Sequence, residues 1–100
     1  MTEKSAAEDL ATLQYARTPR VLWRLAPDCV IVRRVGDSTP DAAAEVTGSA
    51  AVLWMALEGA RSEAQLYAEL QAAGCVDPAA ELQLALHLLI NRRLIAECAP

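Results

Sequence analysis

Two stretches of this 100-residue chain are too apolar to be ordinary surface helices, and they limit what the chain can fold into. In residues 78–93, apolar side chains cover roughly 240° of the helix circumference at about 100° per residue, whereas a helix packed on one side needs about 100°. The stretch 47–59 carries three apolar residues on one face and two elsewhere: Leu53, Trp54 and Leu57, then Val52 and Met55. A domain of this length cannot bury both helices on every side.

The last helix has two apolar stripes, formed by Leu82, Leu86, Leu89 and Ile90 in one case and by Leu84 and Leu88 in the other, with Ala85 between them. Two explanations remain open. Either a sheet and the other helices cover both stripes and complete the core, or the second stripe stays open beside a sheet edge as an apolar groove. Large exposed apolar patches usually mark a partner site.

Short strands precede these helices. The segments "RVLWRLAP" (20–27) and "CVIVRRVG" (29–36) are rich in branched and aromatic residues and meet at Pro27 and Asp28, so they predict a hairpin. Alternation places Val21, Trp23 and Leu25 on one face of the first strand. After the loop at 36–41, "AAAEV" (42–46) has helical propensity, but its place between a hairpin and a capped helix predicts a third, short strand.

Three helices are predicted next, over residues 47–59, 62–74 and 77–93, followed by an extended tail. Their start and stop signals are caps and glycines: Thr47 or Ser49, then Gly59; Ser62 with Gln65 as a capping box, then Gly74; and Asp77 followed by Pro78. The sequence therefore predicts an α+β fold in which a three-stranded antiparallel sheet is followed by three helices.

We expect one folded domain, residues 19–100, preceded by an N-terminal arm, residues 1–18. In the arm, Ser5 and Glu8 have the spacing of a capping box, and Leu10 and Leu13 share a helical face. A short amphipathic helix is one interpretation. A frayed arm, or a segment that docks or dimerises, is another.

Composition argues against several classes of function. The net charge is −4 and the isoelectric point is near 4.8, which disfavours nucleic-acid binding because that is driven by phosphate neutralisation. The longest apolar run, eight residues from Ala50, is far short of the roughly 20 that cross a bilayer, and the start does not resemble a signal peptide. We therefore expect a cytoplasmic protein with no membrane partner.

Catalytic and metal-binding groups are sparse. The three cysteines, Cys29, Cys75 and Cys98, are widely spaced, and His87 is the single histidine. Metal sites need clustered ligands, and acid–base catalysis needs a partner that orients the histidine. We expect no cofactor, no metal and no enzymatic activity.

The predicted third strand suits a different function. Its small side chains leave the backbone N–H and C=O groups accessible, and such an edge can pair with another strand. Strand addition uses main-chain hydrogen bonds for affinity and nearby pockets for specificity. Glu45 is either a solvated charge that guards this edge or a ligand contact.

The segment "VTGSAAVLWMALEGARSEAQLYAELQAAGCVDPAAELQLALHLLINRRLIAE" (46–97) resembles the PqqD-like family, the peptide-recognition elements named for pyrroloquinoline quinone synthesis protein D. The likeness rests on a strand ending in a polar-glycine cap, an "AAVLW" helix, a Ser-capped "EAQLYAEL" helix, an Asp-Pro start and a leucine-rich last helix ending "RRLI". It covers about residues 20–97. Where the family often has a glycine-aromatic element before the third strand, this chain has "DSTPDAA".

The resemblance implies a winged-helix-like domain that binds the leader segment of a precursor peptide and presents it to a modifying enzyme, such as a radical enzyme, a cyclase or a leader protease. The leader would add as a strand to the third strand, with its side chains beside the third helix. Carried over, the peptide-binding residues would be Ala42, Ala43, Ala44, Glu45 and Val46 on the edge, and Glu81, Leu84, Ala85 and Leu88 in the groove.

Two other functions stay open. A winged-helix DNA-binding regulator has the same topology, and it would have to rely on Arg33 and Arg34 and on Arg92 and Arg93 at the end of the last helix. A structural module could instead form a homodimer through the leucines of that helix.

Overall fold

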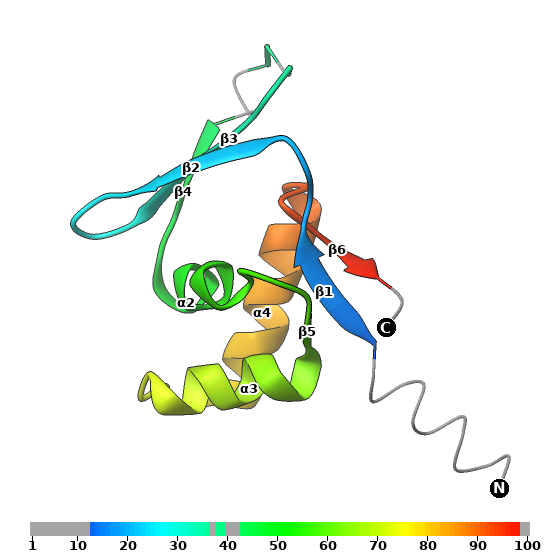
Figure 1. The fold of residues 1–100 in the computed structure, drawn as a ribbon. Helices are drawn as coiled ribbons and strands as arrows, with labels where there is room; N and C mark the ends of the chain where they lie inside the picture. Colours follow the sequence, from blue (N-terminus) through cyan, green and yellow to red (C-terminus); the bar gives the residue numbers. More distant parts are fainter. Residues whose placement is uncertain (1–12, 37, 40–42, 99–100) are drawn as a thin grey trace, which may run out of the picture.

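The computed structural model describes residues 13–36, 38–39 and 43–98. Those residues form an α+β fold with two three-stranded antiparallel sheets and three helices (Figure 1), which confirms the predicted class. The elements are, in chain order, β1 (Gln14–Arg17), β2 (Val21–Leu25), β3 (Val30–Arg34), β4 (Ala43–Val46), α2 (Gly48–Ala56), β5 (Arg61–Ser62), α3 (Glu63–Ala72), α4 (Pro78–Asn91) and β6 (Ile95–Cys98).

The first sheet has the order β2-β3-β4 and is the sheet that the sequence predicts. Its register places Trp23 opposite Val32 and Val32 opposite Ala44, so these residues share one face. Val30, Val32 and Val46 lie on that face and are buried, which shows that it is the face packed on the helices. The three β2 residues that alternation places on one face, Val21, Trp23 and Leu25, all lie on this side of the sheet.

The second sheet, in the order β5-β1-β6, is absent from the sequence prediction. β1 pairs with β6 along its whole length, from Gln14↔Cys98 to Arg17↔Ile95, and with β5 at Gln14↔Ser62 and Tyr15↔Arg61. Gln14–Arg17 is thus a strand of the folded domain, which corrects the prediction of a separate arm or helix for this part of residues 1–18. Residues 1–12, with Ser5 and Glu8, lie outside the described residues.

Two of the three predicted helix starts have the expected capping bonds. In α3 the amide of Gln65 donates to Ser62 Oγ (3.2 Å) and the amide of Ser62 donates to Gln65 Oε1 (2.8 Å), which completes the capping box. In α4 the amide of Ala80 donates to Asp77 Oδ1 (3.3 Å), with Pro78 at the first helical position.

α2 differs from the prediction at both ends. Thr47 is the N-cap residue, but its side chain makes no capping bond. The helix ends at Ala56, three residues before Gly59, and Gly59 does not have a positive φ. Leu57 ends the helix by donating its amide to the carbonyls of Leu53 and Trp54 while its side chain enters the core. The backbone leaves helical geometry at Leu57 (φ −89°, ψ 42°), so the helix stops without a glycine at positive φ.

The core lies between the inner face of the first sheet and the three helices (Figure 1). Its most enclosed helical side chains are 0% or 1% exposed: Leu53, Trp54, Leu57, Leu66, Leu70 and Leu89. Burial of each such side chain stabilises the fold by about 1.5–3 kcal/mol relative to exposure. Within the described residues, every helix is either too short or too polar to span a bilayer.

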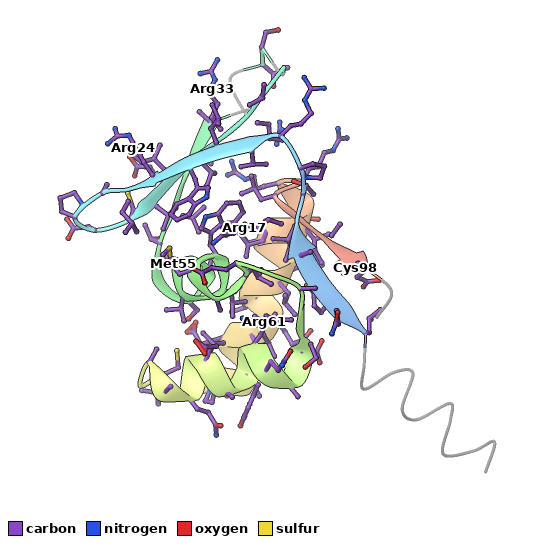
Figure 2. The ribbon with its side chains drawn as sticks, viewed as in Figure 1. Arg17, Arg24, Arg33, Met55, Arg61 and Cys98 are labelled. Atoms are coloured by element: carbon purple, nitrogen blue, oxygen red, sulfur yellow. The ribbon has the colours of Figure 1, made fainter. Side chains whose placement is uncertain are left out.

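Arg17 of β1 links the two sheets to α2 (Figure 2). Its guanidinium carbon lies 4.8 Å from the ring centroid of Trp23 and 4.7 Å from that of Trp54, and the two rings meet edge to face. Arg17 Nε also donates to the carbonyl of Trp54 (3.1 Å). Burial lowers the pKa of Arg17 from its ordinary value. The side chain therefore acts as a half-buried brace that orients the inner face of β2.

Candidate functional site

β4 is an edge strand, because β3 is its one partner among the described residues. Ala43 and Glu45 are exposed and face away from the helices, whereas Val46 is buried and Ala44 packs against the core. Short side chains on three of its four residues leave the outer backbone of this strand open to another chain.

Two hydrogen bonds outside β2 and β3 determine which backbone groups point to each side of β3. The amide of Ala26 donates to the carbonyl of Cys29 (2.9 Å), and the amide of Val35 donates to the carbonyl of Arg20 (2.7 Å). Hydrogen-bonded and non-hydrogen-bonded pairs alternate along an antiparallel ladder. The odd-numbered residues of β3 therefore turn their N–H and C=O groups toward β2, and the even-numbered residues turn theirs toward β4.

The register of β3 with β4 completes this assignment. Val30 opposes Val46 and Val32 opposes Ala44, so Ala44 and Val46 use their backbone groups to pair with β3. The N–H and C=O groups of Ala43 and Glu45 consequently point to the free side of β4. These are the groups that an added strand would meet.

α4 adds an apolar surface. Leu84 is 70% exposed and Leu88 is 46% exposed, while Leu82, Leu86 and Leu89 are buried. The first stripe of α4 therefore belongs to the core, whereas the second stripe, Leu84 and Leu88, is open. This excludes the explanation in which the domain covers both stripes. Ile90 joins neither group cleanly, because it is 38% exposed.

Two hydrogen bonds relate β4 to α4. Ser49, just after β4, donates its hydroxyl to Glu81 Oε2 in the first turn of α4 (2.6 Å). Arg34, at the end of β3, donates Nη1 to the carbonyl of Arg92 just beyond α4 (2.6 Å). Because β3 and β4 are antiparallel, the start of β4 lies toward the end of α4 and the end of β4 toward its start. Leu84 and Leu88 lie between these two points of attachment.

The nine residues predicted to bind peptide divide into three groups. Ala43, Glu45, Leu84 and Leu88 are exposed. Ala44 is half-buried with its backbone turned to β3, and half-buried Glu81 accepts the Ser49 hydrogen bond. Val46 and Ala85 are core residues, at 2% and 4% exposed, so their side chains are not open to a guest in this structure. Ala42 lies outside the described residues.

Two sizeable cavities lie away from these leucines. One of about 480 Å³ opens between the β2–β3 turn and α2, where Leu25, Pro27, Val52 and Met55 are among its lining residues. Another of about 450 Å³ is lined by Arg20, among other residues, at the far end of the sheet. Neither is lined by Leu84 or Leu88, which lie on the exposed surface of α4.

The described residues offer few groups for catalysis. His87 is exposed on α4, and the three cysteines are free thiols. No group of three or more His, Cys, Asp or Glu side chains in the described part of the chain is placed to hold a metal ion. Burial, with the nearby carboxylates of Glu63 and Glu97, raises the pKa of Tyr15 of β1, which donates to Glu63 Oε1 at the start of α3 (3.4 Å). This pair joins the second sheet to α3 and lies outside the edge at β4.

The sequence reasoning missed one cluster of charged residues. It treated Arg34 and Arg93 as parts of two separate surface pairs, whereas the fold brings both to a single cavity with Arg20. Only the pairing of distant segments creates this cluster, so no local pattern in the sequence indicates it.

Comparison of the chain with protein-family models, with curated proteins and with solved structures found no match in any of the three.

Proposed function

We propose that this chain binds the leader segment of a precursor peptide as an added strand on β4 and presents it to a peptide-modifying enzyme, without catalysing a reaction itself. The observation that carries the proposal is the free side of β4, where the backbone groups of Ala43 and Glu45 are unpaired by β3. The resemblance of residues 20–97 to PqqD-like recognition elements supplies the class of guest.

Main-chain pairing supplies affinity in this proposal. Each hydrogen bond between the guest and Ala43 or Glu45 contributes about 0.5–1.5 kcal/mol net. Such bonds are indifferent to the guest's side chains, so they cannot by themselves select a leader.

Selection comes from α4. Leu84 and Leu88 retain enough exposed surface for each to gain about 1–2 kcal/mol when a guest side chain covers it, as a share of the full burial value. A guest strand alternates its side chains, so every second residue would face α4. We therefore expect the leader to carry apolar residues two positions apart.

The test uses a peptide selected for binding from a displayed library of random peptides. Leu88→Glu places a charge on the open stripe, and we expect it to raise the Kd for that peptide at least about tenfold, from the loss of about 1.4 kcal/mol or more. Gln83→Glu is the matched control, since it places the same charge at an exposed position of the same helix. It should bind as the wild type does.

Circular dichroism distinguishes a loss of peptide binding from unfolding of the variant. We expect both variants to keep the wild-type helical signal, because Leu88 is already partly exposed. Unfolding of Leu88→Glu would assign Leu88 to the core, and unchanged binding would remove α4 from the site.

The two rival functions are tested with the same protein. A DNA-binding regulator should shift a DNA duplex in a salt-dependent way, and we expect no shift because the exposed side of α4 carries leucines. A homodimerising module should self-associate in sedimentation experiments, and the selected peptide should compete with that association. A monomer that binds peptide would exclude this rival.

A further inference from the structure

The cavity of about 450 Å³ is built where three distant segments meet: the connection from β1 to β2, the end of β3 and the turn after α4. In Figure 1 the bend between β1 and β2 lies beside the C-terminal end of α4. Thr18 joins these segments by donating its hydroxyl to the carbonyl of Arg93 (2.9 Å). Three arginines, Arg20, Arg34 and Arg93, line the resulting cavity.

Two of these arginines occupy strained backbone positions. Arg20 has φ 65° and Arg93 has φ 60°, and they are the only non-glycine residues with positive φ in the described part of the chain. Residues held in this left-handed region cluster at functional sites, where the side chain is needed in spite of the strain. Here both strained residues belong to one cavity and carry the same charged group.

The end of α3 shows what the backbone alone would favour. There Cys75 donates to the carbonyl of Leu70 (3.1 Å), and the residue with positive φ is Gly74. The end of α4 repeats this arrangement, because Leu94 donates to the carbonyl of Leu89 (2.9 Å). Glycine is the usual residue at this position. Arg93 therefore stands where glycine would be less strained, which points to a role for its side chain.

The charges in the cavity are suited to an anion. The guanidinium groups of Arg20 and Arg93 make no hydrogen bond or ion pair with any described residue. Arg34 is held at the wall by its bond to the Arg92 carbonyl. Among the residues that the structure describes, no Asp or Glu lines the cavity. A guanidinium presents parallel N–H donors that match a carboxylate or a phosphate.

We propose that this arginine cavity binds the carboxylate of an Asp or Glu in the precursor peptide, immediately outside the segment that pairs with β4. This inference rests on the proposed function. The start of β4 pairs with Arg33, the neighbour of Arg34, so a guest that runs past the start of β4 leaves the sheet at the same end as the cavity. A peptide fits better than a nucleic acid because the chain has a net charge of −4 and the neighbouring helix exposes leucines.

The test compares versions of the library-selected peptide that carry two Glu or two Gln residues added at either end. We expect the Glu extension at one end to lower the Kd of the wild-type protein about tenfold relative to Gln at low salt, and much less at high salt. Arg93→Gly and Arg20→Gly should abolish this gain. Arg61→Ala, a change to an arginine outside the cavity, should keep it.

Stability separates a binding role from a structural one. Because glycine tolerates positive φ, Arg93→Gly should have a Tm equal to or above that of the wild type. A lower Tm together with weaker binding of the Gln peptides would indicate a structural role and overturn the inference.

The failure of this inference is distinguishable from failure of the proposed function. If the Gln peptides bind normally and the Glu extensions give no gain, or an equal gain in Arg93→Gly, the cavity has no role in peptide recognition. If the Gln peptides do not bind at β4 at all, the proposed function fails. Inorganic phosphate and a short DNA duplex are tested in parallel. Tight duplex binding that Arg20→Gly and Arg93→Gly abolish would assign the cavity to nucleic acid and overturn the proposal.

Discussion

Replacing Glu45 with proline distinguishes a free sheet edge from an edge whose backbone groups are already hydrogen-bonded within the protein. The N–H of Glu45 points away from β3, so Glu45→Pro removes a donor from the free side of β4 and leaves the existing ladder intact. Proline is tolerated at such positions of edge strands. We expect the free energy of unfolding to change by less than about 1 kcal/mol.

The expected effect on binding is larger. The variant loses one hydrogen bond of about 0.5–1.5 kcal/mol and leaves a guest carbonyl without its donor, which costs about 1–3 kcal/mol. Taken together these terms predict a loss of about 1.5–4.5 kcal/mol, which is at least about tenfold in the Kd of the selected peptide. Fluorescence anisotropy of the labelled peptide measures this change.

Two controls accompany Glu45→Pro. Glu45→Ala removes the charge and keeps the N–H, so it should bind nearly as the wild type does. Ala44→Pro removes a donor that pairs with β3, and the same arithmetic predicts a loss of about 1.5–4.5 kcal/mol in stability, measured by urea unfolding. If Glu45→Pro binds as well as Glu45→Ala, or if both proline variants destabilise the fold equally, the assignment of backbone groups on β4 is wrong.

Two further predictions concern the second sheet. Arg17→Met keeps the aliphatic stem but removes the guanidinium contacts with both tryptophan rings and the bond to the Trp54 carbonyl. It should lower the free energy of unfolding by about 1–2 kcal/mol in urea titrations. An unchanged value would show that Arg17 is not a brace. The raised pKa of Tyr15 means that the fold favours the neutral phenol. The stability that Tyr15 contributes is therefore complete below about pH 10 and is lost as the pH rises through the folded-state pKa. Tyr15→Phe should therefore lose less stability than the wild type between about pH 8 and pH 11, and equal losses would contradict the role of Tyr15.

Local signals were read correctly from the sequence. Ser62 and Gln65 form the predicted capping box because all of its atoms lie within four consecutive residues. Alternation in β2 correctly placed Val21, Trp23 and Leu25 on one face. Spacing on α4 separated the two leucine stripes, although it did not show that Leu84 and Leu88 would be the open ones.

Signals that depend on distant segments were missed. β1 is four residues long, and its partners β5 and β6 lie far along the chain, so the second sheet leaves no local pattern. Val46 and Ala85 were placed in the site by the family resemblance, and the local sequence does not show which side of each element the core covers. The arginine cavity was missed for the same reason, since it exists only after Thr18 joins the turn beyond α4.

Amide hydrogen exchange tests the central claim most directly. In the free protein the amides of Ala43 and Glu45 should exchange quickly, and those of Ala44 and Val46, which pair with β3, should exchange slowly. With the selected peptide bound, Ala43 and Glu45 should become protected while Ala44 and Val46 change little. Protection of Ala43 and Glu45 in the free protein, or no new protection when peptide binds, would contradict strand addition at β4.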